Sequence, residues 1–182
     1  MPAPKALPGF ASPAVGFEQP YDMLAACHER VQRSLDLLAR LIEHVRAQGH
    51  DAQSRSAARD VLRYFDLAAP QHHLDEERHV FPRVLAQGSA SERALVQRLQ
   101  AEHREMEALW AQLQPRLQSW STEQQLAHPD EVAVLAQRYT ALYAQHLQDE
   151  NTVVFPVARG LTPEREIGAM SAEMQGRRLT PR

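Results

Sequence analysis

Two similar stretches, QHHLDEERHVFP at residues 71–82 and QHLQDENTVVFP at residues 145–156, can be aligned on their final Phe-Pro. The alignment pairs His72 with His146 and Glu76 with Glu150, so each copy has His-x-x-x-Glu followed by Val-Phe-Pro. Residues four apart lie on the same face of a helix, one turn above each other. Each copy therefore offers an imidazole and a carboxylate aimed at one point. This pair is half of a metal site if the face is buried, and an ordinary solvated pair if it is exposed.

The composition favours one helical domain. The chain has 182 residues, of which 43% are hydrophobic, and this is enough for one substantial core. Glycine and β-branched residues are few, whereas Ala, Leu, Gln, Glu and Arg dominate, which favours helix nearly throughout. A formal net charge of -3 with mixed signs gives no electrostatic footprint for nucleic acid or for an acidic membrane surface. We therefore expect neither of these partners.

The cysteine content and the first residues indicate the compartment. Cys27 is the single cysteine, so no internal disulfide can form, and the composition suits a reducing cytosol. Residues 1–19 are rich in proline and lack the continuous apolar segment of a signal peptide. No apolar run approaches the roughly 20 residues that span a bilayer. We expect a soluble, cytoplasmic protein in which residues 1–19 form an extended arm.

Apolar residues recur every three or four positions in four long segments, as in amphipathic helices. The pattern predicts helices over about 21–47, 54–85, 91–117 and 130–153, with a loop over 119–130. Pro82 should bend or end the regular turns near it, and Pro115 should kink the third helix in its last turn. Thr-Pro-Glu at 162–164 predicts a short last helix over 163–175. Gly176 and the basic end should then leave the fold.

Four long helices with short connections predict an all-α, up-down-up-down four-helix bundle. We expect the bundle to take residues 20–160. The arm, residues 1–19, would precede it, and a short helix with a tail, residues 161–182, would follow it.

Each predicted helix places one histidine on its otherwise apolar face: His28, His72, His103 and His146. Neighbouring helices of such a bundle are antiparallel and share a loop, so the distance of each histidine from its loop gives its height. His28 and His72 are each about 20 residues, or about 30 Å, from the first loop at 1.5 Å per residue. His72 and His103 are about 14 to 16 residues from the second loop, and His103 and His146 about 16 from the third, which is roughly 21 to 24 Å. The four imidazoles should therefore meet at one depth.

Four histidines at one depth, with Glu76 and Glu150 beside them, predict a metal centre. A single histidine on an apolar face is usually a core residue that bonds a neighbour. Several polar groups in a dry core are costly unless they are paired, and unpaired carboxylates are rarely buried. A cation removes both costs. Four imidazoles and two carboxylates that can bridge favour a pair of first-row transition ions, iron first, with manganese or zinc as alternatives.

Residues next to these six leave some assignments open. Glu107 follows His103 by one turn, so it is either a seventh metal ligand or an outer support for one. His73 and Glu77 form a second pair four residues apart, one residue out of phase, and we expect them to be outer or surface groups. The remaining histidines and the tyrosines near the site are expected to be solvated or plain core, respectively: His44, His50 and His128; Tyr64, Tyr139 and Tyr143.

Two further patterns are weaker. Glu76-x-x-His79 matches the Glu-x-x-His motif of ferritin-like di-iron bundles. The counterpart of His79 in the second stretch is Val153, so this alternative lacks its second copy. Cys27 is adjacent to His28 but turned away from its face, so we do not expect it to bind the metal.

The set resembles the hemerythrin-like, HHE cation-binding domains. The resemblance covers about residues 23–160 and rests on the order His, His-x-x-x-Glu, His, His-x-x-x-Glu, with Val-Phe-Pro after each glutamate. It implies a non-haem di-iron centre inside a four-helix bundle, with the two glutamates bridging. The expected ligands are His28, His72, Glu76, His103, His146 and Glu150, with Glu107 as the candidate seventh.

The chain departs from the oxygen-carrying hemerythrins at two positions. Those proteins have a second histidine four residues after the third-helix histidine and an aspartate five residues after the last one. This chain has Glu107 at the first position, and Glu150 only four residues after His146. Fewer imidazoles and more carboxylate make a harder site that favours ferric iron, which argues against reversible oxygen carriage.

The resemblance implies a protein that binds or senses dioxygen, nitric oxide or peroxide at an open metal position, or that handles iron. The alternative is an enzyme that decomposes peroxide or repairs iron-sulfur centres, although such repair proteins usually carry an extra cysteine-containing domain that these residues do not include. A purely structural metal ranks last, because structural sites seldom need two bridging carboxylates. The arm and the last helix could each dock on a second copy and form a homodimer.

Overall fold

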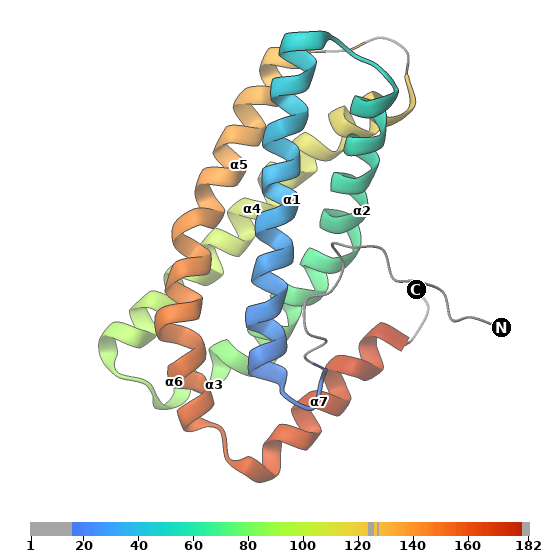
Figure 1. Cartoon of the computed structure of the whole chain (residues 1–182). Coiled ribbons are helices and arrows are strands. Elements are labelled where there is room, and N and C mark those ends of the chain that lie inside the picture. Colours follow the sequence, from blue (N-terminus) through green and yellow to red (C-terminus); the bar gives the residue numbers. More distant parts are fainter. Residues whose placement is uncertain (1–15, 124–125, 127, 180–182) are drawn as a thin grey trace, which may run out of the picture.

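Four long helices form a bundle in the computed structural model, which describes residues 16–123, 126 and 128–179. They are α1 (Pro20–Gln48), α2 (Ala52–Asp75), α4 (Ala90–Thr122) and α5 (Pro129–Asp149). Successive long helices run in opposite directions, and α5 packs back against α1, which closes the bundle (Figure 1). The prediction of an all-α bundle with a shorter C-terminal helix is confirmed. The predicted arm lies outside the described residues except for 16–19.

Local signals set the helix ends. Asp51 and Ser54 form a reciprocal capping box at the start of α2, and Ser89 and Glu92 form one at the start of α4. Each box satisfies backbone N–H groups that have no partner within the helix. Gly49 ends α1 with φ 86°, a left-handed conformation that glycine adopts without steric cost.

The third predicted helix extends beyond its predicted end. α4 continues through Pro115 to Thr122, so the loop expected over 119–130 begins later. Proline removes one backbone hydrogen bond from a helix interior. Leu113, Leu117 and Trp120, on both sides of Pro115, are fully buried, and their packing offsets that loss.

A five-residue π-helical turn interrupts each His-x-x-x-Glu helix. After α2 comes η1 (Glu76–Val80) and then α3 (Phe81–Gln87); after α5 comes η2 (Glu150–Val154) and then α6 (Phe155–Leu161). The Phe81 N–H bonds to the Glu76 carbonyl, five residues back, and Phe155 bonds to Glu150 in the same way. A proline ring would clash with the carbonyl four residues before it, and the wider turn before Phe-Pro relieves this clash. The predicted disturbance near Pro82 is therefore a π turn that starts at the glutamate.

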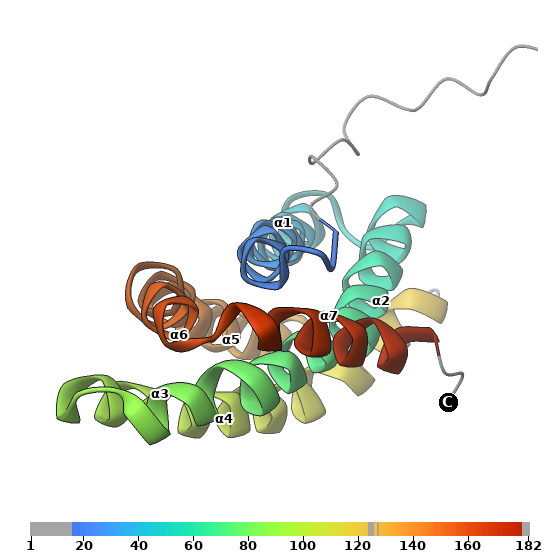
Figure 2. The same cartoon turned by 90° about the horizontal axis from the view of Figure 1, so that it is seen from below.

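The last helix, α7 (Glu164–Leu179), crosses one end of the bundle (Figure 2). It is longer than the predicted 163–175, and the expectation that the chain leaves the fold at Gly176 is wrong for residues 176–179, which belong to the helix. Arg177 and Arg178 both pair with the carboxylate of Asp75, which is completely buried. A buried carboxylate needs a partner, and these two arginines supply it by extending the helix.

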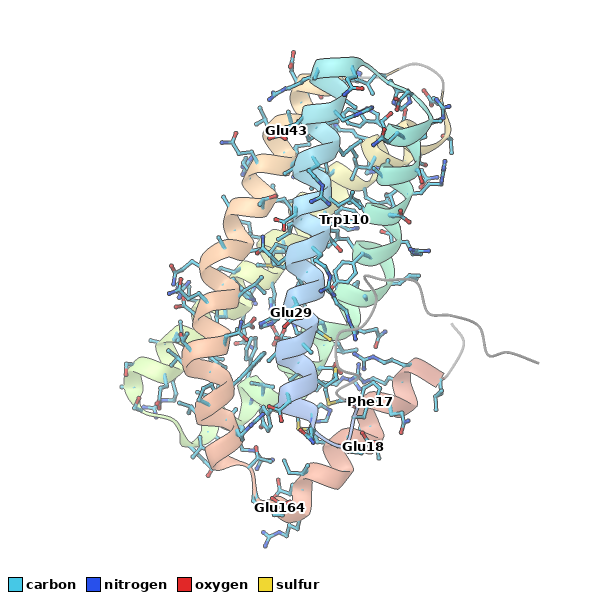
Figure 3. All side chains as sticks on the ribbon, in the orientation of Figure 1. Phe17, Glu18, Glu29, Glu43, Trp110 and Glu164 are labelled. Carbon is cyan, nitrogen blue, oxygen red and sulfur yellow. The ribbon has the colours of Figure 1, made fainter. Side chains whose placement is uncertain are left out.

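The side chains that fill the bundle (Figure 3) form two apolar clusters with a polar layer between them. On α1, Leu24 belongs to the cluster near α7 and Val31 to the other, and His28 lies between them. On α4, His103 separates Leu99 from Met106 in the same way. The polar layer is therefore a single level of the core.

Among the described residues, no helix combines the length and the apolar character that crossing a bilayer requires.

Candidate metal centre

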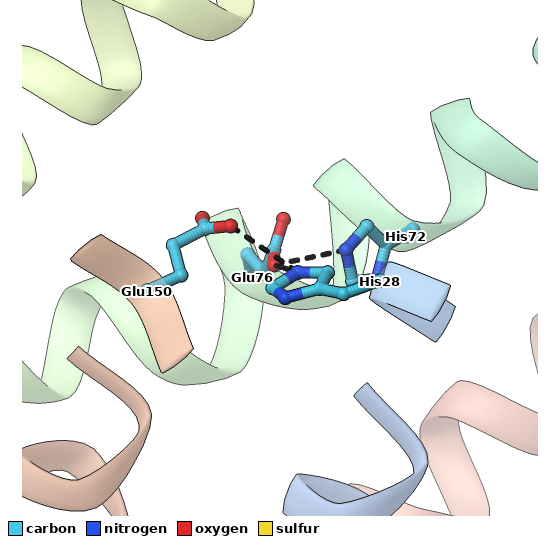
Figure 4. A group of neighbouring side chains, drawn as sticks. All are labelled: His28, His72, Glu76 and Glu150. Carbon is cyan, nitrogen blue, oxygen red and sulfur yellow. Dashed lines mark ion pairs between the residues drawn. The ribbon is translucent and has the colours of Figure 1, made fainter. Parts of the chain in front are cut away.

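Six polar side chains from the four long helical segments meet in this layer. His28 comes from α1, His103 from α4, and the two His-x-x-x-Glu pairs from the ends of α2 and α5 and the first residues of η1 and η2. All six are at most 4% exposed, and Glu76 and Glu150 are completely buried. Figure 4 shows His28, His72 and both glutamates converging on one point. The predicted coincidence of height is present in the structure.

The carboxylates join two groups of imidazoles. Oε1 of Glu76 lies 3.5 Å from Nε2 of His28 and 3.2 Å from Nε2 of His72, whereas its Oε2 lies 3.6 Å from Nε2 of His103. Glu150 is arranged the same way. Its Oε2 lies 3.3 Å from Nε2 of His28, and its Oε1 lies 3.2 Å from Nε2 of His146 and 3.9 Å from that of His103. Each carboxylate therefore turns one oxygen to each group.

Three imidazoles are oriented by acceptors on their outer nitrogen, Nδ1. The pairs are His28 with Oδ1 of Asn151 at 2.9 Å, His103 with Oε1 of Glu77 at 3.0 Å, and His146 with Oε2 of Glu102 at 2.9 Å. An acceptor at Nδ1 holds the proton there and leaves the Nε2 lone pair facing the centre. This outer hydrogen bond is what metal-binding histidines usually make.

The atoms that face the centre lack partners. Among the described residues, the buried side-chain atoms without a hydrogen bond include Nε2 of His28, both ring nitrogens of His72 and all carboxylate oxygens of Glu76 and Glu150. The short distances between them become favourable only if a proton or a cation lies between nitrogen and oxygen. Nε2 of His103 also lies only 3.1 Å from Nε2 of His146. This contact between two nitrogens likewise needs a proton or a cation between them. Four imidazoles and two carboxylates whose inner atoms lack hydrogen-bond partners fit transition-metal ions.

The pKa values indicate which groups of the cluster hold protons when no metal is bound. Burial lowers the pKa of His28 and His146, but the carboxylates of Glu150 and Glu76 outweigh it and raise these values to about 10 and about 9. Burial, together with repulsion from Glu150, raises the pKa of Glu76 to about 7. Burial acts on Glu150 in the same direction, yet His146 and His28 hold its pKa well below the usual range. Burial and then His28 keep the pKa of His72 well below its usual value. Protons thus take the place of a cation.

Glu107, the candidate seventh ligand, does not join this cluster. Its side chain is exposed, and it belongs to neither group of candidate ligands within the described part of the chain. The buried line of α4 continues from His103 through Met106 and Leu109, so the helix turns Glu107 outward. The structure therefore argues against Glu107 as a ligand.

His73 is more buried than expected. It is 8% exposed, and its ring stacks on that of His103 at a centroid distance of 4.1 Å. Its partner Glu77 is an outer group, as expected, because it accepts the hydrogen bond from His103. His79 pairs with Glu173 of α7, and Cys27 is directed at Met23. Neither belongs to the groups of candidate ligands.

The fold and the site together define a class of protein. Its members are helical bundles with a metal-binding site made of histidines and carboxylates. Residues 19–158 match the family model described as hemerythrin HHE cation binding domain. The chain belongs to this family. It is also 26% identical, over 162 residues, to a Haemophilus influenzae protein described as "Uncharacterized protein", a match that covers 89% of this chain and 91% of that one.

The outer acceptor Glu102 gives the first prediction. Glu102→Ala removes the group that orients His146, and we expect a loss of metal affinity of roughly 10- to 100-fold. Titration of the metal-free protein against a competing chelator measures this change. Glu105→Ala is the matched control, because it removes an exposed carboxylate from the same helix. Equal affinities of the two variants would contradict a role for Glu102 in the site.

Metal binding should also release protons. At about pH 7 the metal-free cluster holds protons on His28 and His146 and a fraction of one on Glu76, so binding should release about two protons or more per chain. Because protons compete with the metal, affinity should rise as the pH rises toward the raised histidine pKa values. Calorimetry in buffers of different ionisation enthalpy measures the number released. No release at this pH would mean that the metal binds elsewhere.

Proposed function

We propose that the protein is a non-haem di-iron protein that binds or senses a small ligand. One ion would lie between His28 and His72 and the second between His103 and His146, with Glu76 and Glu150 bridging. The observation that carries this proposal is that each carboxylate directs one oxygen at each pair of imidazoles. A site for one ion would not need this arrangement.

The donors support iron as the metal. Each ion would receive two imidazole nitrogens and two carboxylate oxygens, a mixed set that suits iron, with manganese or zinc as alternatives. Glu107 adds nothing to either set. With only four protein donors, each ion would have room for an external ligand, and the small molecule would bind there.

The surroundings support a small ligand. A cavity of about 50 Å³ lies one ring away from the cluster, because His73, which stacks on the candidate ligand His103, is part of its wall. The rest of its wall includes Phe65, Trp110 and Tyr143. A space of this size suits dioxygen, nitric oxide or peroxide rather than an organic substrate.

The binding or sensing of dioxygen, nitric oxide or peroxide, or the handling of iron, is our first proposal for the role. Peroxide decomposition is the second, and one observation favours it: the Tyr143 hydroxyl and Nε2 of His73 form a buried pair, 3.4 Å apart, beside the cluster. This pair could exchange a proton with a bound peroxide. The single cysteine supports the cytoplasm as the compartment.

The test uses protein purified from iron-supplemented cells. We expect about two irons per chain. Exposure of the reduced protein to air or nitric oxide should produce charge-transfer absorption bands. Bands that disappear on removing the gas would support binding or sensing, whereas gas evolution from peroxide would support decomposition. Iron that responds to none of these would overturn the small-ligand proposal.

A further inference from the structure

We propose that Tyr143, Tyr139 and Trp110 form a path for single electrons between the metal centre and the protein surface. This proposal rests on the proposed function, because it requires a redox-active metal. Peroxide can oxidise the centre when no ligand or substrate is present to be oxidised in turn. The path would then let the protein reduce the centre with electrons from its surface.

The inner end of the path touches the ligand rings. Tyr143 is completely buried on α5, and its ring centroid lies 6.3 Å from that of His146. It also lies 6.1 Å from the ring of His73, at an interplanar angle of 28°, and His73 stacks on His103. Tyr143 therefore lies directly beside His146, and the ring of His73 connects it to His103.

The path continues outward through two oxidisable rings. The centroids of Tyr143 and Tyr139 are 5.1 Å apart, and their hydroxyls are 3.4 Å apart. Tyr139 lies 5.7 Å from Trp110. Trp110 is partly exposed, and its indole N–H donates to Asp66 at 2.9 Å. Figure 3 shows Trp110 midway along the bundle. No step between successive rings exceeds the contact range of aromatic pairs.

The side chains around the path distinguish it from plain aromatic packing. Phe65 contacts Trp110 and both tyrosines, but a phenyl ring is much harder to oxidise and lies beside the line. Each end of the line has a hydrogen-bond partner, Nε2 of His73 for the Tyr143 hydroxyl and Oδ1 of Asp66 for the Trp110 indole N–H. A core that needed only apolar volume would require neither hydroxyl groups nor acceptors.

The transfer balances in electrons and protons. Tyr143 gives one electron toward the peroxide-oxidised centre, and in the same step its phenolic proton moves across the 3.4 Å hydrogen bond to Nε2 of His73. Tyr139 restores Tyr143 by giving it an electron and its hydroxyl proton. Trp110 then gives an electron to Tyr139 and its indole proton to Asp66, and the proton on His73 returns through the two hydroxyls to Tyr139. A thiolate in solution reduces the Trp110 radical, which recovers its proton from Asp66, and the thiolate becomes a thiyl radical.

The first arm of the test needs no redox chemistry from the metal. Zinc-loaded protein, whose metal has no redox change, is oxidised by azidyl radicals in a pulse-radiolysis experiment, and the tryptophan radical is followed by absorption. We expect it to convert to a tyrosyl radical in the native protein, which is the step between Tyr139 and Trp110 run in reverse. Tyr139→Phe keeps the ring but should slow this conversion several-fold. Tyr64→Phe is the matched control, because Tyr64 is near the site but its hydroxyl bonds to the Cys27 carbonyl, off the path.

The second arm uses the reduced, iron-loaded protein with one equivalent of peroxide and no thiol. Mass spectrometry of peptides should show oxidation at Trp110, and less of it in Tyr139→Phe and Tyr143→Phe. Zinc-loaded protein gives the background from peroxide in solution, because Trp110 is equally exposed there.

The two arms separate the path from the proposed function. Radical conversion that is absent, or unchanged in Tyr139→Phe, overturns the path whatever the iron does. Conversion that depends on Tyr139, with no iron-dependent oxidation in the second arm, supports the path and contradicts a peroxide-reactive centre. Iron-dependent oxidation of Trp110 that Tyr139→Phe leaves unchanged also overturns the path.

Discussion

Replacing His72 and Glu76 together by alanine is expected to remove most of the bound metal. In the proposed centre, His72 would supply one nitrogen to one ion and Glu76 one oxygen to each ion, so the double variant would remove donors from both. It would also leave Glu150, which is completely buried between imidazoles, as the single bridging candidate. Metal content per chain, measured after purification from iron-supplemented cells, should fall close to the background level.

A matched variant separates ligand loss from general damage. Glu43→Ala with His44→Ala removes one carboxylate and one imidazole from α1, near the end of the bundle opposite α7 (Figure 3). This pair lies outside the candidate ligand groups, and we expect native metal content. If the His72/Glu76 variant is folded, as judged by circular dichroism, and still retains its full metal content, the site assignment is wrong.

Removing the metal is expected to lower the thermal unfolding midpoint by roughly 10 °C. Metal present at about a thousand times its dissociation constant stabilises the fold by about 4 kcal/mol, and each kcal/mol shifts the midpoint of a chain of this size by roughly 2–4 °C. The physical cause is the burial of Glu76 and Glu150, whose oxygens have no hydrogen-bond partners and repel each other across the centre. Calorimetry with and without a chelator measures the shift.

The same variants provide the controls for this shift. The Glu43/His44 variant should respond to the chelator as the native protein does, whereas the His72/Glu76 variant should not respond. A native midpoint that the chelator leaves unchanged would show that the buried carboxylates do not depend on a cation.

Helix geometry made the six central residues predictable. A rise of 1.5 Å per residue and antiparallel neighbours convert residue counts from the loops into heights, and His28, His72, His103 and His146 do reach one layer. The four-residue spacing placed Glu76 and Glu150 beside them. These relations depend on distances along each helix, which the sequence contains.

The rotation of each helix about its axis is not contained in those distances. It decides that Glu107 faces solvent and that His73 is buried against His103. It also brings Asn151 of η2 to His28 on α1, and Glu102 of α4 to His146 on α5. These contacts join neighbouring helices, so no spacing within one helix predicts them. The sequence contains only a weak signal for these contacts: each acceptor is a charged or amide residue next in sequence to one of the central histidines or glutamates.

The π turns were only partly predictable. Proline at 82 and 156 indicated a disturbance of the regular turns, but the sequence did not distinguish a bend from a wider turn. In the structure both π turns begin at the glutamates of the polar layer, Glu76 and Glu150, and π turns are frequent at functional sites. The repeated Val-Phe-Pro is therefore part of how the site is built.

Anomalous diffraction at the iron absorption edge, from crystals of the iron-loaded protein, tests the central claim most directly. Two peaks should appear in the polar layer, one bound by His28 and His72 and the other by His103 and His146, both within reach of Glu76 and Glu150. A single peak, or iron bound outside this layer, would contradict a pair of ions bridged by the two glutamates.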